Sequence, residues 1–222
     1  MAIAVAVKDE KPEHASENGS ESAKRRQVLD GARQVFMRDG FDGASMNDVA
    51  RIAGVSKGTL YVYFPSKEAL FEAYVRDEKR RQAEQICRFD YANPDVAVAL
   101  ESYARNFIEA LTRPEALAHT RTVIGVTAKI PSIGRAFFEA GPSYGIARFA
   151  DYIQGLQQAG KLEVDDPEEA AVVFLELAKS GLFGKLIFCA DIRITREEIE
   201  AQARRAVRLF LRLYGRQQPG KV

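Results

Sequence analysis

The polar residues whose types and spacing most suggest chemistry lie between residues 45 and 67. Two of them, Ser45 and Ser56, stand where short helices are predicted to begin. Hydroxyl groups and backbone N–H groups at helix N-termini bind phosphates, and side chains that project from a helix can reach base edges. The segment therefore offers candidate contacts to DNA, and these are Ser45, Ser56, Lys57, Gly58, Thr59, Tyr61, Tyr63 and Lys67.

Two short predicted helices, 46–53 and 57–63, hold these residues. Gly54 supplies the turn between them, and Ala50 is small enough to let the helices approach. Apolar side chains would fill the wedge between the helices, namely Val49, Ile52, Val55 and Leu60. This is helix-turn-helix geometry, in which the second helix enters the major groove of double-stranded DNA and the first lies across the backbone.

The alternative is a helical hairpin inside a bundle, with Tyr61, Tyr63 and Phe64 as core aromatics. A core hairpin would not need the polar run Ser56-Lys57-Gly58-Thr59 in front of those rings. The spacing therefore favours a DNA-binding unit, with Phe64 alone expected in the core.

The rest of the chain is also predicted to be helical, so the expected fold class is all-α with about nine or ten helices. Capping residues, prolines and glycines mark the ends of the predicted helices throughout the chain. The expected domains are a flexible tail over 1–20, the DNA-binding domain over 21–66, a larger helical domain over 67–214 and a flexible tail over 215–222. The predicted helices outside the DNA-binding pair are 22–38, 67–89, one from Asn93-Pro94, 114–129, one from Gly141-Pro142 to 160, 167–189 and 196–214.

The charge composition bears on whether the chain can bind nucleic acid. The chain has 222 residues with 32 Lys or Arg and 31 Asp or Glu, a net charge of +1, which at first argues against a nucleic-acid binder. Residues 21–67 alone hold eight basic and five acidic side chains, a net +3. DNA affinity is then expected to rest on a few placed contacts and on two-fold symmetry.

No motif of an enzyme, cofactor site or metal site is found in the sequence. Two cysteines and two histidines leave little for a disulfide framework or a metal site, and they fit a reducing compartment. Neither a Gly-rich phosphate loop nor a nucleophile elbow is present. We expect a cytoplasmic protein that is not an enzyme, with no cofactor, no metal and no membrane partner.

A more specific pattern runs from residue 28 to residue 70. Its residues are Phe36, Gly40, Phe41, Ser45, Asp48, Val49, Ala50, Ala53-Gly54-Val55-Ser56, Gly58-Thr59-Leu60-Tyr61, Tyr63-Phe64 and Ser66-Lys67-Glu68-Ala69-Leu70. This pattern resembles the DNA-binding domain of the TetR family of transcriptional regulators. Further along, Phe137-Phe138-Glu139-Ala140-Gly141-Pro142 and Asp165-Asp166-Pro167 resemble the AefR-like subgroup of that family.

The resemblance implies a role for each candidate residue. Base edges would face Asn47, Lys57, Gly58 and Tyr61. Asparagine suits adenine and lysine suits guanine. Val62 departs from the larger aromatic residue that many relatives carry. Phosphates would be bound by Ser45, Ser56, Thr59, Tyr63 and Lys67.

The resemblance also implies a homodimer that holds a small effector in its larger domain. The predicted helix 167–189 is apolar on more than one face, so it must be buried on both sides. Gly181 and Gly184 would let another helix approach closely, and the last helix would complete a four-helix interface. The alternative is that both helices are buried in the core of a monomer.

Aromatic side chains at helical spacing could line the effector site. Such stripes can equally be plain core, and the sequence leaves both readings open. His119 and Arg121 are candidate polar handles. An apolar site would favour an apolar or aromatic effector. The candidate ligand-binding residues are Phe107, Leu111, Phe137, Phe138, Tyr144, Phe149, Tyr152 and Phe174.

The expected function is a homodimeric repressor that binds a palindromic operator and leaves it when a small-molecule effector binds. Two alternatives stay open. One is an activator, or a regulator that responds to a protein. The other is a helical small-molecule-binding protein without DNA binding.

Overall fold

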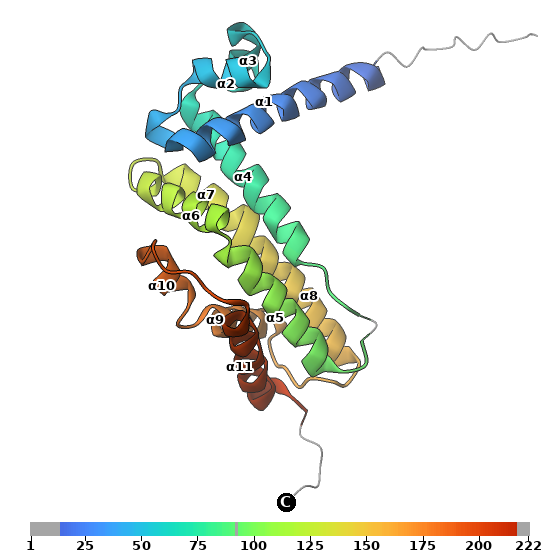
Figure 1. The fold of residues 1–222 in the computed structure, drawn as a ribbon. Coiled ribbons are helices and arrows are strands. Elements are labelled where there is room, and N and C mark those ends of the chain that lie inside the picture. The colour runs from blue at the N-terminus through green and yellow to red at the C-terminus, as the bar shows by residue number, and fades with distance from the viewer. Residues whose placement is uncertain (1–13, 92, 217–222) are drawn as a thin grey trace, which may run out of the picture. The chain divides into compact units, whose positions relative to one another are not determined.

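The computed structural model describes residues 14–91 and 93–216, and these fold into two compact units (Figure 1). One unit ends at Leu70 and the other begins at Phe71. The described part has helices throughout and no β-strand, which confirms the all-α prediction. None of its helices combines the length and the apolarity needed to cross a bilayer. The helices are α1 (His14–Gly43), α2 (Met46–Ala53), α3 (Lys57–Tyr63), α4 (Lys67–Ile86), α5 (Val96–Thr112), α6 (Pro114–Thr127), α7 (Pro131–Phe138), a π-helical segment η1 (Glu139–Ser143), α8 (Tyr144–Gln158), α9 (Pro167–Lys179), α10 (Phe183–Phe188) and α11 (Arg196–Tyr214).

The first unit is built on α1. Its apolar stripe, from Val28 to Phe36, is buried as predicted. Gly31 lets α2 approach closely, because a Cβ at this position would lie 2.7 Å from the Cβ of Ala53. At Gly40 the backbone turns left-handed, with φ at 68°, and interrupts the helix near its predicted end.

The second unit packs α5, α8, α9 and α11 around an aromatic core. Tyr103 and Phe149 stack with ring centroids 4.5 Å apart, and Phe149 lies 4.8 Å from Phe174. Phe174 meets Phe210 of α11 edge-on at 5.0 Å. The short helix α10 packs on α5 and α6 beside this core.

Side-chain caps set several helix starts in the way the sequence predicts. Ser45 and Ser56 accept the N–H groups of Asp48 and Thr59 at 3.1 and 3.0 Å. Thr195 forms the full capping box predicted for α11. Each cap of this kind stabilises a helix by about 1 kcal/mol.

Three predicted helix boundaries after residue 90 are wrong. The fifth helix begins after Asp95 rather than at Asn93-Pro94, since the Asp95 carboxylate accepts the N–H groups of Ala97 and Val98. Gly141-Pro142 does not restart a helix, because η1 carries the chain from α7 into α8 without a break. The predicted helix 167–189 is divided into α9 and α10 at Gly181, whose φ is 75°.

The predicted tails are only partly within the described residues. Residues 1–13 and 217–222 lie outside them, so flexibility there stays a prediction. Helix α1 begins at His14, within the predicted tail. At the other end, Gly215 forms an antiparallel bridge with Leu162, and Arg216 donates to the carbonyl of Gly160 at 3.3 Å.

Candidate nucleic-acid interface

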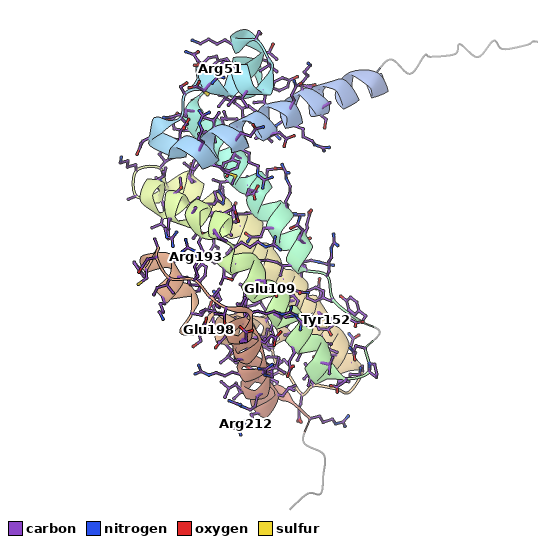
Figure 2. The ribbon with its side chains drawn as sticks, viewed as in Figure 1. Arg51, Glu109, Tyr152, Arg193, Glu198 and Arg212 are labelled. Atoms are coloured by element: carbon purple, nitrogen blue, oxygen red, sulfur yellow. The ribbon has the colours of Figure 1, made fainter. Side chains whose placement is uncertain are left out.

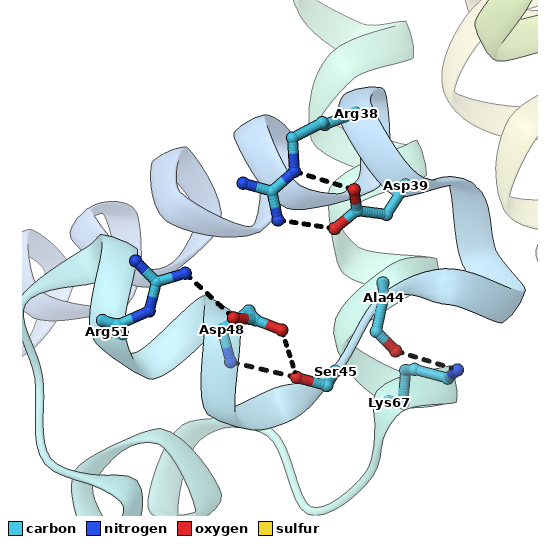
Figure 3. A network of polar contacts seen from close by, with 7 residues as sticks. All are labelled: Arg38, Asp39, Ala44, Ser45, Asp48, Arg51 and Lys67. Carbon is cyan, nitrogen blue, oxygen red and sulfur yellow. Dashed lines mark hydrogen bonds and ion pairs between the residues drawn. The ribbon is translucent and has the colours of Figure 1, made fainter.

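A polar network fixes the start of α2 (Figure 3). The Ser45 hydroxyl accepts the Asp48 N–H and donates to the Asp48 carboxylate at 2.6 Å. Arg51 donates to the other carboxylate oxygen at 2.9 Å. These two partners, Ser45 first, hold the pKa of the Asp48 carboxyl below its ordinary value. The Ser45 proton therefore goes to the Asp48 carboxylate, and the first backbone N–H groups of α2 remain available as donors at this helix end.

Helix α3 buries one side and exposes the other. Leu60 is fully buried, and Phe64 just beyond the helix is buried as expected. Lys57 and Gly58 are exposed, and 41% of Tyr61 is accessible. The helix thus presents a polar and aromatic face outward, in agreement with the prediction for a recognition helix rather than a core hairpin.

Nothing within the described fold requires a glycine at position 58. Its φ is not positive, and an added Cβ would meet only the Ser56 hydroxyl, at 3.8 Å. A glycine near the start of a helix costs stability relative to alanine. The absence of a side chain at position 58 therefore leaves the α3 backbone open to close approach from outside.

Lys67 has a structural role that the sequence did not suggest. Its ammonium donates to the carbonyls of Phe41 at 2.9 Å, Ala44 at 3.2 Å and Asp42 at 3.4 Å, and lies 4.6 Å from the centre of the Phe41 ring. Figure 3 shows the bond to Ala44. Three carbonyls use all three donors of an ammonium group. Its predicted phosphate contact stays a prediction and would compete with these bonds.

The remaining predicted residues differ in exposure. Asn47 is exposed beside the α2 start. Thr59 is half-buried, with its hydroxyl 2.8 Å from that of Ser56. Tyr63 is also half-buried. The first unit therefore brings the predicted set together at the starts of α2, α3 and α4 and on one face of α3.

A basic run on α1 was not among the residues that the sequence predicted for this surface. Lys24, Arg25 and Arg26 are exposed. The Gln27 amide donates to the carbonyl of Ala53 at 2.7 Å, and the Arg25 guanidinium lies 5.2 Å from the centre of the Phe64 ring. These contacts hold the run beside the ends of α2 and α3. The three consecutive basic residues in the sequence were the signal that could have identified this run.

The predicted ligand-binding aromatics do not form one site. Phe149, Tyr152 and Phe174 are fully buried and closely stacked with their neighbours, as in plain core. Phe107 and Leu111 are half-buried on α5, and 57% of Phe138 is exposed. A ligand-binding role for the whole set stays a prediction, and the packing favours the plain-core alternative for the three buried rings.

Two neighbouring cations of α4, one buried and one exposed, contact two of the other predicted residues. Only 4% of Lys79 is exposed, its ammonium donates to Gln82 at 2.9 Å, and it lies 4.2 Å from the centre of the Phe137 ring. Burial lowers the pKa of Lys79 to about 8. The guanidinium of the next residue, Arg80, lies over the Tyr144 ring at 3.9 Å from its centre. His119, a predicted polar handle, lies edge-on to Tyr74 at 5.1 Å.

A cavity of about 300 Å³ lies elsewhere in the second unit, between the end of α5, helix α6, helix α10 and the segment that follows it. None of the eight predicted ligand-binding residues lines it. Arg121, the other predicted handle, does. The sequence could not reveal this cavity, because it depends on the break between α9 and α10.

Comparison with known proteins now decides the family. Residues 28–74 match the model of bacterial regulatory proteins of the tetR family. Residues 98–216, more than half of the chain, match the model of the C-terminal domain of AefR-like transcriptional repressors. The chain belongs to the TetR family. Both the family and the subgroup resemblance of the sequence are confirmed.

Other regulators resemble it over most of their length. A helix-turn-helix transcriptional repressor of Mycobacterium tuberculosis is 27% identical, over 74% of this chain and 83% of the relative. A solved structure from Mesorhizobium loti, titled as a TetR-family transcriptional regulator, has 28% identity and a TM-score of 0.78, covering 88% of this chain and 98% of that one. A solved flavonoid-responsive regulator has 32% identity and a TM-score of 0.75, covering 89% of this chain and all of that one.

This TetR-family protein is therefore a DNA-binding transcriptional regulator, as the sequence predicted. Regulators of the family bind DNA, dimerise and bind small molecules.

Proposed function

We propose that the protein is a repressor that binds a palindromic operator as a homodimer and is released by a small-molecule effector. The observation that carries the DNA-binding part is the outward face of α3. Lys57, Gly58 and Tyr61 are exposed there, and the fold itself gives no reason for a glycine at 58. A close approach of DNA to the α3 backbone supplies that reason.

In this proposal α3 lies in the major groove. Lys57 and Tyr61 contact base edges together with Asn47 from α2, and Gly58 lets the backbone come close. Ser56, Thr59 and Tyr63 contact phosphates around the helix, where the first turn of α3 also offers backbone N–H groups. Ser45 and Lys67 complete the predicted set, and their present hydrogen bonds make them the least available members.

The dimer is proposed to form through α9 and α11. Val172 on α9 is 39% exposed and Leu213 on α11 is 65% exposed, although both helices also contribute to the core. Apolar side chains left outside the core on both helices support burial against a second copy. Two-fold symmetry would place the recognition helices about 34–36 Å apart, or a multiple of that spacing, along the operator.

Release by an effector requires a ligand that binds the two states of the protein unequally. Helix α4 begins in the first unit and continues into the second, so a shift of this helix could change the spacing of the recognition helices. The flavonoid response named for one structural relative supports an apolar or aromatic effector.

A gel-shift experiment with the DNA upstream of the protein's own gene tests the DNA-binding part. Tyr61→Ala should weaken specific binding about tenfold or more and relax sequence preference. Tyr91→Ala removes an exposed tyrosine from the second unit and serves as the control, with affinity unchanged. Unaltered binding in Tyr61→Ala and in Lys57→Ala would refute the docking. If no upstream DNA binds, the alternative of a ligand-binding protein without an operator gains support.

The sign of regulation needs a second measurement. Transcription from a bound promoter should fall when the protein is added and recover with effector. Transcription that rises on addition would identify an activator. An effector that saturates the protein without changing operator affinity would refute the release.

A further inference from the structure

The cavity in the second unit has a wall that is apolar apart from three residues. It lies where the end of α5 and the start of α6 face α10 and the segment that follows. Its volume of about 300 Å³ is at the lower end of the range for small-molecule sites. The apolar lining consists of Pro114, Leu117, Leu186, Ala190, Ile192 and Ile194.

Two arginines supply the hydrogen-bond donors of this wall. Arg121, half-buried on α6, donates through its guanidinium to the carbonyls of Leu186 and Ile187 near the C-terminal end of α10. Arg193 is exposed and donates from Nη1 to the carbonyls of Ala190 and Ile192 at 2.7 and 3.0 Å. A guanidinium has five N–H groups, so donors remain on both side chains.

The positive charge of the wall has no acidic counterpart. None of the described residues that line the cavity is acidic, and neither guanidinium forms an ion pair with any residue in the described ranges. The remaining polar lining residue, Thr112, donates its hydroxyl proton to the carbonyl of Ile108 at 2.8 Å. An apolar chamber with two cationic donors suits an apolar molecule that carries an anionic oxygen.

We propose that this cavity binds a small organic acid, with an apolar body of one or two rings inside and a carboxylate or phenolate at the guanidiniums. Arg193, which follows α10 at the cavity (Figure 2), would contact the acid directly. An acid that pairs with Arg121 would compete with the carbonyls that hold α10 against α6. The idea rests on the proposed function in one respect, which is that the occupant would be the effector.

Isothermal titration of the full-length protein without DNA tests the site. The probes are 2-naphthoate and its neutral isostere 2-naphthamide. Naphthoate should bind at least tenfold more tightly than naphthamide. Arg193→Gln should weaken naphthoate binding about tenfold, a range expected for a lost hydrogen bond to a charged group, and should leave naphthamide binding unchanged.

Two further variants locate the binding. Ala190→Trp places a large side chain at an exposed position of the lining and should abolish naphthoate binding. Arg88→Gln removes a positive charge from an exposed position of the same unit, outside the lining, and should have no effect. Arg121 is left intact, because its bonds hold α10 and its loss would disturb the fold.

Four outcomes would overturn the proposal. They are equal binding of the two probes, naphthoate binding that survives Ala190→Trp, an equal loss in Arg88→Gln, and no naphthoate binding at millimolar concentration. Failure of the proposed function looks different. In that case naphthoate binds as described, but the gel shift shows operator affinity unchanged when the cavity is saturated.

Discussion

Two turns of this protein use the same device in different settings. Gly54 and Gly181 both have a positive φ, 64° and 75°, and each lies in the turn between two consecutive helices. After Gly54, Ser56 caps α3 from within the turn. After Gly181, α10 begins at Phe183 without a side-chain cap, and Arg121 of α6 donates to its last carbonyls. The first turn is specified by neighbouring residues and the second by a residue distant in the sequence.

The same difference separates the two units. In the first unit, local caps and the contact between α1 and α2 place the DNA-binding side chains. In the second unit, aromatic packing and buried charge set the positions. Four substitutions test this contrast, from the largest expected effect to the smallest.

Phe174→Ala should lower the free energy of unfolding by about 3–5 kcal/mol, because it removes a fully buried ring of the second unit. Phe138→Ala, at an exposed position on α7, should change it by less than about 0.5 kcal/mol. Urea unfolding followed by circular dichroism measures both. A small loss for Phe174→Ala would favour a ligand pocket at that ring over packed core.

Lys79→Met should raise the free energy of unfolding at pH 7 by roughly 3 kcal/mol, since the buried ammonium has a pKa of about 8 instead of 10.5. Between these pH values the unfolded chain keeps a proton that the folded protein gives up. The wild type therefore gains stability as pH rises from 8 to 10.5, and its deficit relative to the variant should shrink.

Urea unfolding at pH 7, 9 and 10.5 follows this difference. Lys185→Met, at an exposed position on α10, is the control and should show no pH-dependent gap. A gap between Lys79→Met and wild type that stays constant over the pH range would contradict a charged, buried Lys79.

Lys67→Met sharpens the comparison inside the first unit, because Lys67 is held there by tertiary contacts. Loss of its bonds to three carbonyls should cost about 1.5–3 kcal/mol of unfolding free energy. The salt dependence of operator binding should stay the same. If Lys67 is instead a phosphate contact, stability should hold and the slope of log affinity against log salt should fall by about 0.9 per subunit.

Gly58→Ala should have opposite effects on folding and on binding. The unfolding free energy should rise by up to about 1 kcal/mol, because alanine is the better helix former. Operator affinity should fall about tenfold, since the added methyl occupies the approach to DNA. Gly125→Ala, in α6 with open space around its Cβ, should stabilise without changing DNA affinity. Unchanged operator affinity in Gly58→Ala would remove the main support for the docking of α3.

The sequence predicted what neighbouring residues determine. The helix starts at Ser45, Ser56 and Thr195, the turn at Gly54 and the buried stripe of α1 all follow local rules, and the structure confirms them. The role of Lys67 was missed, because its partners lie more than 20 residues away in the chain.

The second unit was less predictable for physical reasons. The apolar run 167–189 is predicted from its sequence to be one helix. Only the folded structure shows that the helix is interrupted at Gly181. The spacing of the aromatic residues predicts that Phe149, Tyr152 and Phe174 are buried. It does not show whether these rings line a ligand pocket or pack against each other. The cavity is formed by segments that meet only after folding. No local sequence pattern therefore predicts that Thr112, Leu117 and Arg193 lie close together.

The π-helical segment η1 affects which deletions this protein can tolerate during evolution. A π-helical turn carries one residue more than an α-helical turn, and here it joins α7 to α8 without a break. Deleting one residue between Glu139 and Ser143 would turn this π-turn into an α-turn, so the residues after it would keep nearly the same angular position about the helix axis. Phe149 and Tyr152 would then stay in the core. A deletion inside α8 itself would instead rotate the residues after it by about 100°, so single deletions are better tolerated in η1 than in the helix that follows.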